Sequence, residues 1–111
     1  DSVLLAQMLD AARRIAQRIA HVNRDEFDGN EDLRDALAHR IQIIGEAASK
    51  ISQKYRAKHS EIPWAKIIGM RHRIVHDYMN VDFDILWQTT KQDIGELVIL
   101  LETLAERRNV E

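Results

Sequence analysis

The chain has 111 residues, a length that suits one folded domain with a single core and is too short for two. Hydrophobic residues make up 45% and charged residues 31%, the balance of an ordinary globular protein. The absence of cysteine excludes disulfides and a catalytic thiol and favours a reducing compartment. No segment reaches the roughly 20 apolar residues that span a bilayer, and the start lacks the basic region of a signal peptide. We therefore expect a cytoplasmic protein without membrane attachment.

The net charge of −2 argues against a general nucleic-acid coat protein, but the charges are unevenly distributed. Residues 50–76 hold seven lysines and arginines against one acid, whereas residues 81–105 hold five acids against one lysine. Such an uneven charge distribution can attract a phosphate backbone to the basic side of a nearly neutral molecule. By itself the pattern is equally typical of solvated helix faces.

The first half of the chain predicts two long helices. Apolar residues recur at three-and-four spacing from position 4 to 19, as on one face of a helix that ends near Val22. A polar loop, NRDEFDGN (23–30), follows. Asn30 is a suitable cap for a second helix, with Glu31 and Asp32 in its first turn, whose apolar stripe continues to Tyr55.

The second half predicts two more helices. Pro63 is tolerated in the first turn of a helix that runs into the segment RHRIVHDY (71–78). Residues 78–80 indicate a break between the third and the last helix, and Asp82 is a suitable cap for the last helix. Three glycines inside helical patterns predict close helix contacts: Gly45, Gly69 and Gly95.

The apolar run at 97–101 covers most of the circumference of the last helix, which must therefore be buried on more than one side. A second subunit would supply the additional surface, although a central core helix is the competing explanation. The sequence thus predicts a single domain over residues 1–111, an all-α antiparallel bundle of four to five helices that forms a homodimer.

Arg71 and His76 offer a minimal set of groups for metal-free RNA cleavage. An arginine can stabilise charge on a phosphate in the transition state, and a histidine can move protons near neutral pH. His76 would activate a ribose 2′-hydroxyl or protonate the leaving oxygen while Arg71 holds the phosphate. Five steps of about 100° leave the two side chains roughly 140° apart on an unbroken helix. Either the helix ends near Val75, or active groups converge from two chains; a helix-capping Arg71 and a surface His76 are the structural alternative.

Two metal-binding alternatives use overlapping residues. His72 and His76 are four residues apart and would share a helix face, but no glutamate follows His72 as the H-E-x-x-H pattern requires. The pair His76-Asp77 is also the dipeptide of helical metal-dependent phosphohydrolases, for which His39 and Asp93 would have to supply further ligands. Nothing in the spacing marks those two residues, so we expect no metal and no other cofactor.

Glu46 is a carboxylate inside an apolar segment, IIGEAA (43–48). A buried acid needs a partner. Gln42 and Lys50 lie four residues to either side, and Arg71 could reach Glu46 from the third helix. We expect Glu46 to pair structurally and to support the site rather than to act in catalysis.

Tyr78 follows His76 by two residues and is expected to leave the same helix end. It would place a hydroxyl beside the site, where it could contact substrate or receive a modification. An amphipathic tyrosine at the core edge is the structural alternative.

Taken together, these segments strongly resemble HepT-like proteins of the HEPN superfamily, in the same order along nearly the whole chain. An Arg-to-His spacing alone is common, whereas the combined string of about twenty positions is specific. The matching segments are RIQIIGEAA (40–48), IPW (62–64), IIGMR (67–71), VHDY (75–78) and VD (81–82), with Trp87.

The resemblance implies a dimeric helical bundle in which the Arg-x-x-x-x-His motifs of two subunits meet in a cleft. It implies a metal-independent RNase toxin whose partner is a MntA-like minimal nucleotidyltransferase antitoxin. The sequence leaves open whether two dimers associate into a higher oligomer. Carried over by position, Arg71 and His76 would be catalytic. Tyr78 would be the tyrosine that the antitoxin, using ATP, modifies with AMP. The added bulk and negative charge would then oppose RNA binding.

Two positions depart from the pattern of that family. His72 stands where asparagine is common, and Asp77 stands where glycine is frequent. His72 and Arg73 would contact or support substrate, whereas the negative charge of Asp77 would repel RNA. These departures leave an alternative of another class: a non-catalytic subunit that binds a nucleotidyltransferase and presents Tyr78 or a nucleotide pocket.

Overall fold

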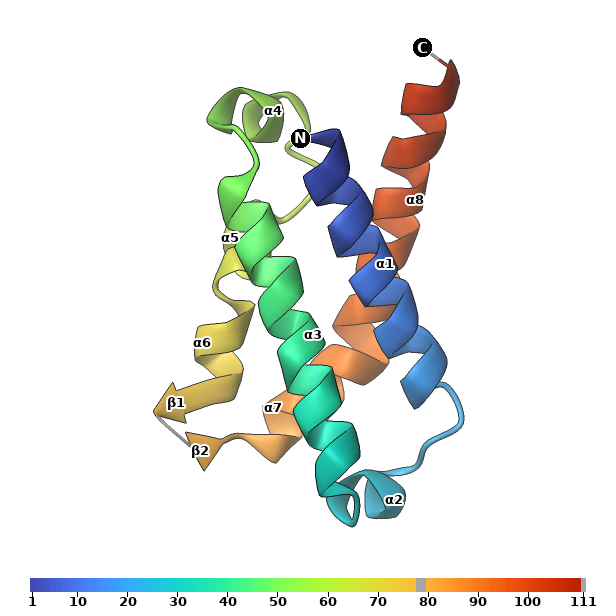
Figure 1. Cartoon of the computed structure of the whole chain (residues 1–111), viewed down its shortest axis with the longest axis vertical. Helices are drawn as coiled ribbons and strands as arrows, with labels where there is room; N and C mark the ends of the chain where they lie inside the picture. Colours follow the sequence, from blue (N-terminus) through green and yellow to red (C-terminus); the bar gives the residue numbers. More distant parts are fainter. Residues whose placement is uncertain (78–79, 111) are drawn as a thin grey trace.

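The computed structural model describes residues 1–77 and 80–110, with side chains for residues 1–74 and 80–107. The chain forms an up-and-down bundle (Figure 1). The first two legs are α1 (Ser2–Ile19) and, after the short α2 (Arg24–Asp28), α3 (Glu31–Lys50). A third leg follows α4 (Gln53–Lys58) and consists of α5 (Trp64–Ile68) and α6 (Met70–Ile74). The hairpin of β1 (Val75–Asp77) and β2 (Asn80–Val81) then leads into the last leg, formed by α7 (Phe83–Gln88), a π-helical turn η1 (Thr89–Asp93) and α8 (Ile94–Val110). The predicted all-α antiparallel bundle is thus confirmed in outline. The predicted number of four to five helices was too low for the described residues, because two of the legs are divided and two short helices, α2 and α4, join the others. The small hairpin is a further addition.

The core lies between α1, α3 and the last leg, with α5 and α6 packed against α3. Its residues occupy the apolar stripes that predicted the long helices, so burial of these stripes away from water drives the association of the legs. The largest side chains with almost no exposed surface include Met8, Ile15, Phe27, Leu37, Ile41, Ile44, Ile67, Ile74, Leu86 and Ile94.

The start of α3 confirms the predicted cap. The Asn30 side chain accepts a hydrogen bond from the Leu33 amide at 3.0 Å, and Glu31 and Asp32 lie in the first turn. The end of this helix is earlier than predicted, because Ile51 adopts an extended conformation after Lys50. Ser52 then caps α4 by accepting from the Tyr55 amide at 3.2 Å.

The predicted loop at 23–30 contains a helix that the sequence reading missed. Asn23 accepts a hydrogen bond from the Glu26 amide at 2.8 Å and caps α2. This five-residue helix carries Phe27, which is fully buried. A segment too short to show helical periodicity is therefore fixed by its cap and by one aromatic anchor.

The last leg is not one uninterrupted helix. At η1 the backbone widens into a π turn, and Lys91 donates a hydrogen bond to the Ile19 carbonyl oxygen at the end of α1, at 2.8 Å. In α8, Leu97 and Leu101 are buried, whereas Ile99 is 67% exposed. The chain by itself therefore covers one side of the apolar run, and the predicted second subunit stays a prediction.

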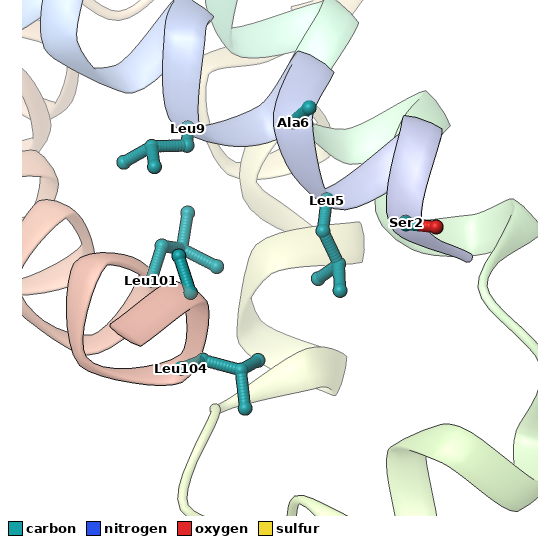
Figure 2. A pocket seen from close by; sticks show the side chains of 7 residues that line it. Ser2, Leu5, Ala6, Leu9, Leu101 and Leu104 are labelled. Carbon is teal, nitrogen blue, oxygen red and sulfur yellow. The ribbon is translucent and has the colours of Figure 1, made fainter. Parts of the chain in front are cut away.

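Near the free ends of α1 and α8 lies a small apolar pocket of about 130 Å³. Leu5 and Leu9 of α1 face Leu101 and Leu104 of α8 across it (Figure 2). The side chains that line this pocket are uncharged, and none of them belongs to the motif at 71–78. In the part of the chain that the structure describes, no helix is both long enough and apolar enough to cross a membrane.

Candidate active site

The third predicted helix is divided at Gly69, which terminates α5. The Gly69 amide donates to the Ala65 carbonyl oxygen at 3.0 Å, and the Arg73 amide donates to the Gly69 carbonyl oxygen at 3.2 Å. The second half, α6, is anchored by Met70 and Ile74, both buried. The polar motif residues between these anchors are consequently held at the surface on a helix of only five residues.

Three motif side chains lie on this short helix. Arg71, His72 and Arg73 are all exposed. The Arg71 guanidinium makes no hydrogen bond or ion pair with any described side chain or backbone group. The Arg73 guanidinium donates to the Lys66 carbonyl oxygen at 3.4 Å. Arg71 is thus a charge that the fold presents to solvent, as a phosphate-binding group requires.

The helix ends between the two catalytic candidates. Ile74 is the last residue of α6, and the backbone of His76 belongs to β1, which pairs antiparallel with β2. Of the two predicted alternatives, a helix end near Val75 is thus the one that the described backbone shows, while convergence of groups from two chains stays a prediction. An unbroken helix would hold Arg71 and His76 roughly 140° apart, and the change to a strand removes this constraint.

Two of the predicted site features lie outside the described part of the structure. They are the side chain of His76 and the whole of Tyr78. The convergence of Arg71 with His76, and the position of the tyrosine beside them, accordingly stay predictions. The structure describes the residues that border the hairpin, Ile74 at the end of α6 and Asp82 before α7.

The base of the hairpin is closed by one backbone hydrogen bond. The Asp82 amide donates to the Ile74 carbonyl oxygen at 2.7 Å, which joins the end of α6 to the start of α7. The Asp82 side chain in turn accepts from the Ile85 amide at 3.1 Å and caps α7, as predicted. Asp82 therefore sets both the exit of the hairpin and the start of the next helix.

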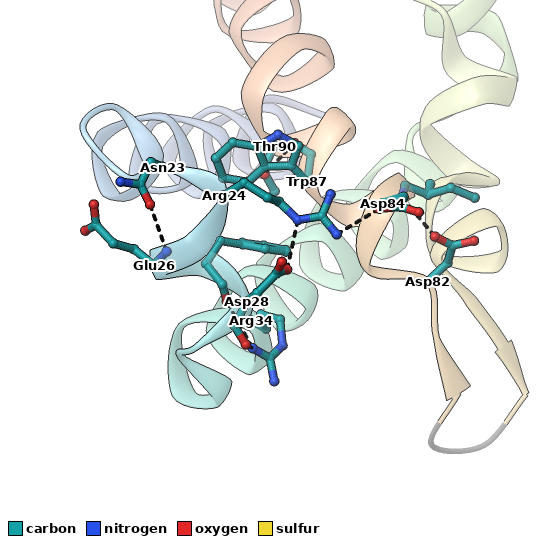
Figure 3. Close-up of polar contacts among 11 residues, drawn as sticks. Asn23, Arg24, Glu26, Asp28, Arg34, Asp82, Asp84, Trp87 and Thr90 are labelled. Atoms are coloured by element: carbon teal, nitrogen blue, oxygen red, sulfur yellow. Dashed lines mark hydrogen bonds and ion pairs between the residues drawn. The ribbon is translucent and has the colours of Figure 1, made fainter.

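Arg24 of α2 anchors α7 from the opposite side of the hairpin exit (Figure 3). Its guanidinium contacts Asp28 at 2.8 Å and Asp84 at 2.7 Å, and the hydrogen bonds to these carboxylates raise the pKa of Arg24 above its ordinary value. Phe27 packs against Trp87 with ring centroids 5.1 Å apart. Sequence reasoning missed this support. The signal that could have revealed it is the Asn23 cap, followed by acids in the first turn of α2.

The expectation that Glu46 is buried was wrong, whereas its expected structural pairing is confirmed with Gln42 as the partner. Glu46 is exposed on α3 and accepts a hydrogen bond from the Gln42 side chain at 3.1 Å; the described contacts do not include one between Glu46 and Arg71. Two steps along a helix turn a side chain by about 200° from Ile44, which faces the core. Apolar neighbours in sequence therefore did not make Glu46 a core residue.

The predicted close contacts at the three glycines were right at one position and wrong at another. A Cβ atom on Gly45 would lie 3.5 Å from the Ile67 carbonyl oxygen, so α3 approaches α5 closely there. At Gly95 a Cβ atom would meet no atom within 4 Å. Gly69 serves instead as the end of α5.

The described part of the structure contains no cluster of potential ligands for the two metal-binding alternatives. Among the described residues, no three histidine, aspartate or glutamate side chains are grouped so that they could hold a metal ion. His39 is exposed on α3, whereas Asp93 lies in η1, 3.9 Å from the Lys66 amine. Neither of these two residues, which the phosphohydrolase alternative would need, belongs to a group of three potential ligands within the described structure.

Comparison with known proteins identifies the family. A family described as "Ribonuclease HepT-like" matches residues 8–104, and no solved structure gives a significant match. The chain is 32% identical over 93 residues to "Putative RNase TTE0752" of Caldanaerobacter subterraneus subsp. tengcongensis, with 84% of this chain and 83% of the relative covered. It is 31% identical to "Probable ribonuclease HepT" of Thermococcus cleftensis, with 84% of each chain covered. A third relative, "Putative RNase MJ1380" of Methanocaldococcus jannaschii, is 29% identical over 84% of this chain and 85% of its own. The chain therefore belongs to the ribonuclease HepT-like family.

Proposed function

We propose that this protein is a metal-independent endoribonuclease in which Arg71 and His76 carry out the reaction, in a cleft completed by a second copy of the chain. The observation that carries the proposal is the environment of Arg71. Its guanidinium is exposed on α6 and has no hydrogen-bond or ion-pair partner in the described structure. Membership of a ribonuclease-named family supports the same assignment.

The proposed reaction is cleavage of a phosphodiester by the neighbouring 2′-hydroxyl of the ribose. A base takes the 2′-hydroxyl proton as the oxygen attacks phosphorus, the bond to the 5′-oxygen breaks, and an acid returns a proton to that oxygen. A cyclic 2′,3′-phosphate and a free 5′-hydroxyl result. His76 would carry the proton in one of these two roles, and Arg71 would stabilise the charge on the non-bridging oxygens.

The test is RNA cleavage by the purified protein and by Arg71→Ala and His76→Ala variants, in buffer that contains a chelator. We expect the cleavage rate to fall by roughly 100-fold or more in each variant. Arg14→Ala is the matched control, because Arg14 is an exposed arginine of α1 that is paired only with Asp10 among the described residues. This control should cleave RNA at the parent rate.

Three outcomes would contradict the assignment. A folded Arg71→Ala or His76→Ala variant with the parent rate would place the active site elsewhere. Loss of activity on chelation would favour the metal-binding readings of His72 and the His76-Asp77 pair. If the parent protein leaves varied cellular RNAs intact yet binds a nucleotidyltransferase, the chain is the non-catalytic binding subunit.

We further propose that the protein acts as a cytoplasmic toxin that a MntA-like nucleotidyltransferase neutralises by modifying Tyr78. The Tyr78 oxygen would attack the α-phosphorus of ATP bound to the partner, pyrophosphate would leave, and the hydroxyl proton would pass to the partner or to water. The resemblance of the segment VHDY (75–78) to the His-x-Tyr step of that family supports this proposal.

The sequence offers a sharp test of this modification, because the chain contains only two tyrosines. After incubation with the nucleotidyltransferase encoded beside it and ATP, mass spectrometry should detect one AMP per chain. Tyr78→Phe should abolish the added mass, and Tyr55→Phe should leave it unchanged. Modification that persists in Tyr78→Phe would contradict the assignment.

The proposed dimer rests on the apolar residues that α8 leaves uncovered. Ile99 is 67% exposed, and Val98 and Leu100 are only partly buried. Light scattering should give twice the mass of one chain, or four times if dimers pair. Mixing inactive Arg71→Ala with inactive His76→Ala should restore part of the activity if each site combines groups from two chains. A monomeric protein with full activity would contradict the proposal.

A further inference from the structure

A groove of about 420 Å³ lies between the leg that carries the motif and the start of the last leg. Its lining residues come from α5 and α6 on one side and from α7 and η1 on the other, and α6 contacts α7. Its lining combines cationic, amide and hydroxyl side chains with one apolar residue and one carboxylate. The residues are Lys66, Arg73, Ile85, Gln88, Thr89 and Asp93.

Two cations on this lining have spare binding capacity. Arg73 is exposed and donates one hydrogen bond, at the long distance of 3.4 Å, to the Lys66 carbonyl oxygen. The Lys66 amine lies 3.9 Å from an Asp93 carboxylate oxygen, a loose contact for an ion pair. A guanidinium carries five N–H donors in a planar fork that matches phosphate oxygens, so most donors of Arg73 are available to a ligand.

Thr89 provides an independent observation at the same place. It is 2% exposed and lines the groove, yet its hydroxyl has no hydrogen-bond partner within the described part of the chain. The adjacent Thr90, equally buried, donates to the Trp87 carbonyl oxygen at 3.1 Å. The Thr89 residue is largely buried, but its hydroxyl oxygen is not fully enclosed by protein atoms, and Thr89 lines the groove, which leaves this hydroxyl available to a ligand there.

The backbone at Thr89 is also unusual. Thr89 is the first residue of η1. Although π turns within helices are rare, those that occur are often found at functional sites. Thr89 and Asp93 are the first and last residues of this turn, and both line the groove together with Gln88 at the end of α7. The hydroxyl and the two cations therefore approach one space from different legs of the bundle.

We propose that this groove binds a phosphate group of the RNA strand, next to the phosphate that is cleaved. Arg73, Lys66 and the Thr89 hydroxyl would donate to its oxygens, and Ile85 and Gln88 would contact the attached sugar or base. The proposal rests on the proposed ribonuclease function. Arg71 and Arg73 are separated by one residue and point about 160° apart on α6, so they would hold different phosphates of one strand.

The experiment measures binding of single-stranded RNA by fluorescence anisotropy, in a His76→Ala background that prevents cleavage. We expect Arg73→Ala to weaken binding about tenfold and to lower the slope of log affinity against log salt by about 1. Thr89→Val, which keeps the shape but removes the hydroxyl, should weaken binding several-fold. Lys54→Ala, which removes an exposed cation of α4 outside the groove, should bind like its parent.

Asp93→Asn gives a prediction of opposite sign. Removing this carboxylate takes away a negative charge from the groove and frees Lys66, so RNA should bind several-fold more tightly. A purely structural role for these residues would not produce tighter binding. The effects of Arg73→Ala and Asp93→Asn should also shrink for RNAs of one or two nucleotides, which cannot reach both arginines.

The outcomes separate this proposal from the proposed function. If the unmodified protein cleaves RNA while Arg73→Ala, Thr89→Val and Asp93→Asn bind it like their parent, the groove proposal is wrong and the ribonuclease assignment stands. If Arg73-dependent RNA binding is found without any cleavage, the groove proposal stands and the ribonuclease assignment fails. If AMP binds at the groove with the same dependence on Arg73 and displaces RNA at equal concentration, the site is for a mononucleotide, and the assignment to an RNA strand is overturned.

Discussion

The two halves of the bundle differ in the length of their helices and in how much of their surface is buried. On one side, α1 and α3 are 18 and 20 residues long, and their apolar stripes are buried along nearly their whole length. On the other, α5, α6 and α7 have five or six residues each, and Arg71, His72 and Arg73 are exposed. We call α1, α3 and α8 the frame, and the segment 64–88 the site segment.

This contrast indicates what each part needs from its residues. Helices as short as those of the site segment are not stable by themselves, so they depend on anchors such as Met70 and Ile74 and on the cap at Asp82. The frame derives its stability from burial distributed over many residues. Substitutions in the frame should therefore change stability, and substitutions in the site segment should change geometry and activity.

The largest stability effect is expected from Ile15→Ala in the frame. Ile15 has no exposed surface, and its truncation should lower the free energy of unfolding by about 2–5 kcal/mol, because a cavity remains where the side chain was. Urea denaturation followed by circular dichroism measures this change. Arg71→Ala, by contrast, should stay within about 0.5 kcal/mol of the parent, as exposed positions do. If the free energy of unfolding fell equally in the two variants, the distinction between the frame and the site segment would be contradicted.

A matched pair of caps gives an intermediate effect. Asn30→Ala removes the cap of α3 and Asp82→Ala removes the cap of α7, and each should cost about 1 kcal/mol in unfolding experiments. Only Asp82→Ala should also lower RNA cleavage, because it loosens the exit of the hairpin that carries His76. Activity is compared at a temperature where both variants are fully folded. Equal cleavage rates in the two variants would show that the cap at Asp82 does not position the site.

The smallest effect is expected at a glycine of α8. Gly95→Ala should raise the free energy of unfolding by about 0.5–1 kcal/mol, because alanine is favoured over glycine in a helix and the new methyl group meets no neighbour. The gain from Gly45→Ala should be smaller, since its methyl group would rest on the Ile67 carbonyl oxygen. Thermal unfolding of both variants measures the difference. A larger gain at Gly45 would contradict the close approach of α3 to α5.

Local sequence signals were reliable wherever one residue controls its own helix end or a long stripe faces the core. The caps at Asn30 and Asp82 followed from the residues alone. The same holds for the stripes of α1 and α3. Each of these features depends on interactions within a few residues, or on the period of the helix.

Glu46 and α2 show where such reading fails. Glu46 has apolar neighbours in sequence but lies on the exposed side of α3, and only the packing of the other legs decides which side that is. The helix α2 is too short to produce a period, and Phe27 holds it through contacts with Trp87 of α7, a residue distant in sequence. Both outcomes depend on partners that the local pattern does not contain.

The sequence by itself determined the helical class, the family and the position of the motif from Arg71 to Tyr78. Only the tertiary structure decided that Arg71 has no partner among the described groups, that α6 ends at Ile74, and that Lys66, Arg73 and Thr89 line one groove. The physical reason is that periodicity and capping act within a helix, whereas exposure and grooves arise where separate legs meet. The chain encodes its elements locally, and the bundle sets which of their side chains remain available to a ligand.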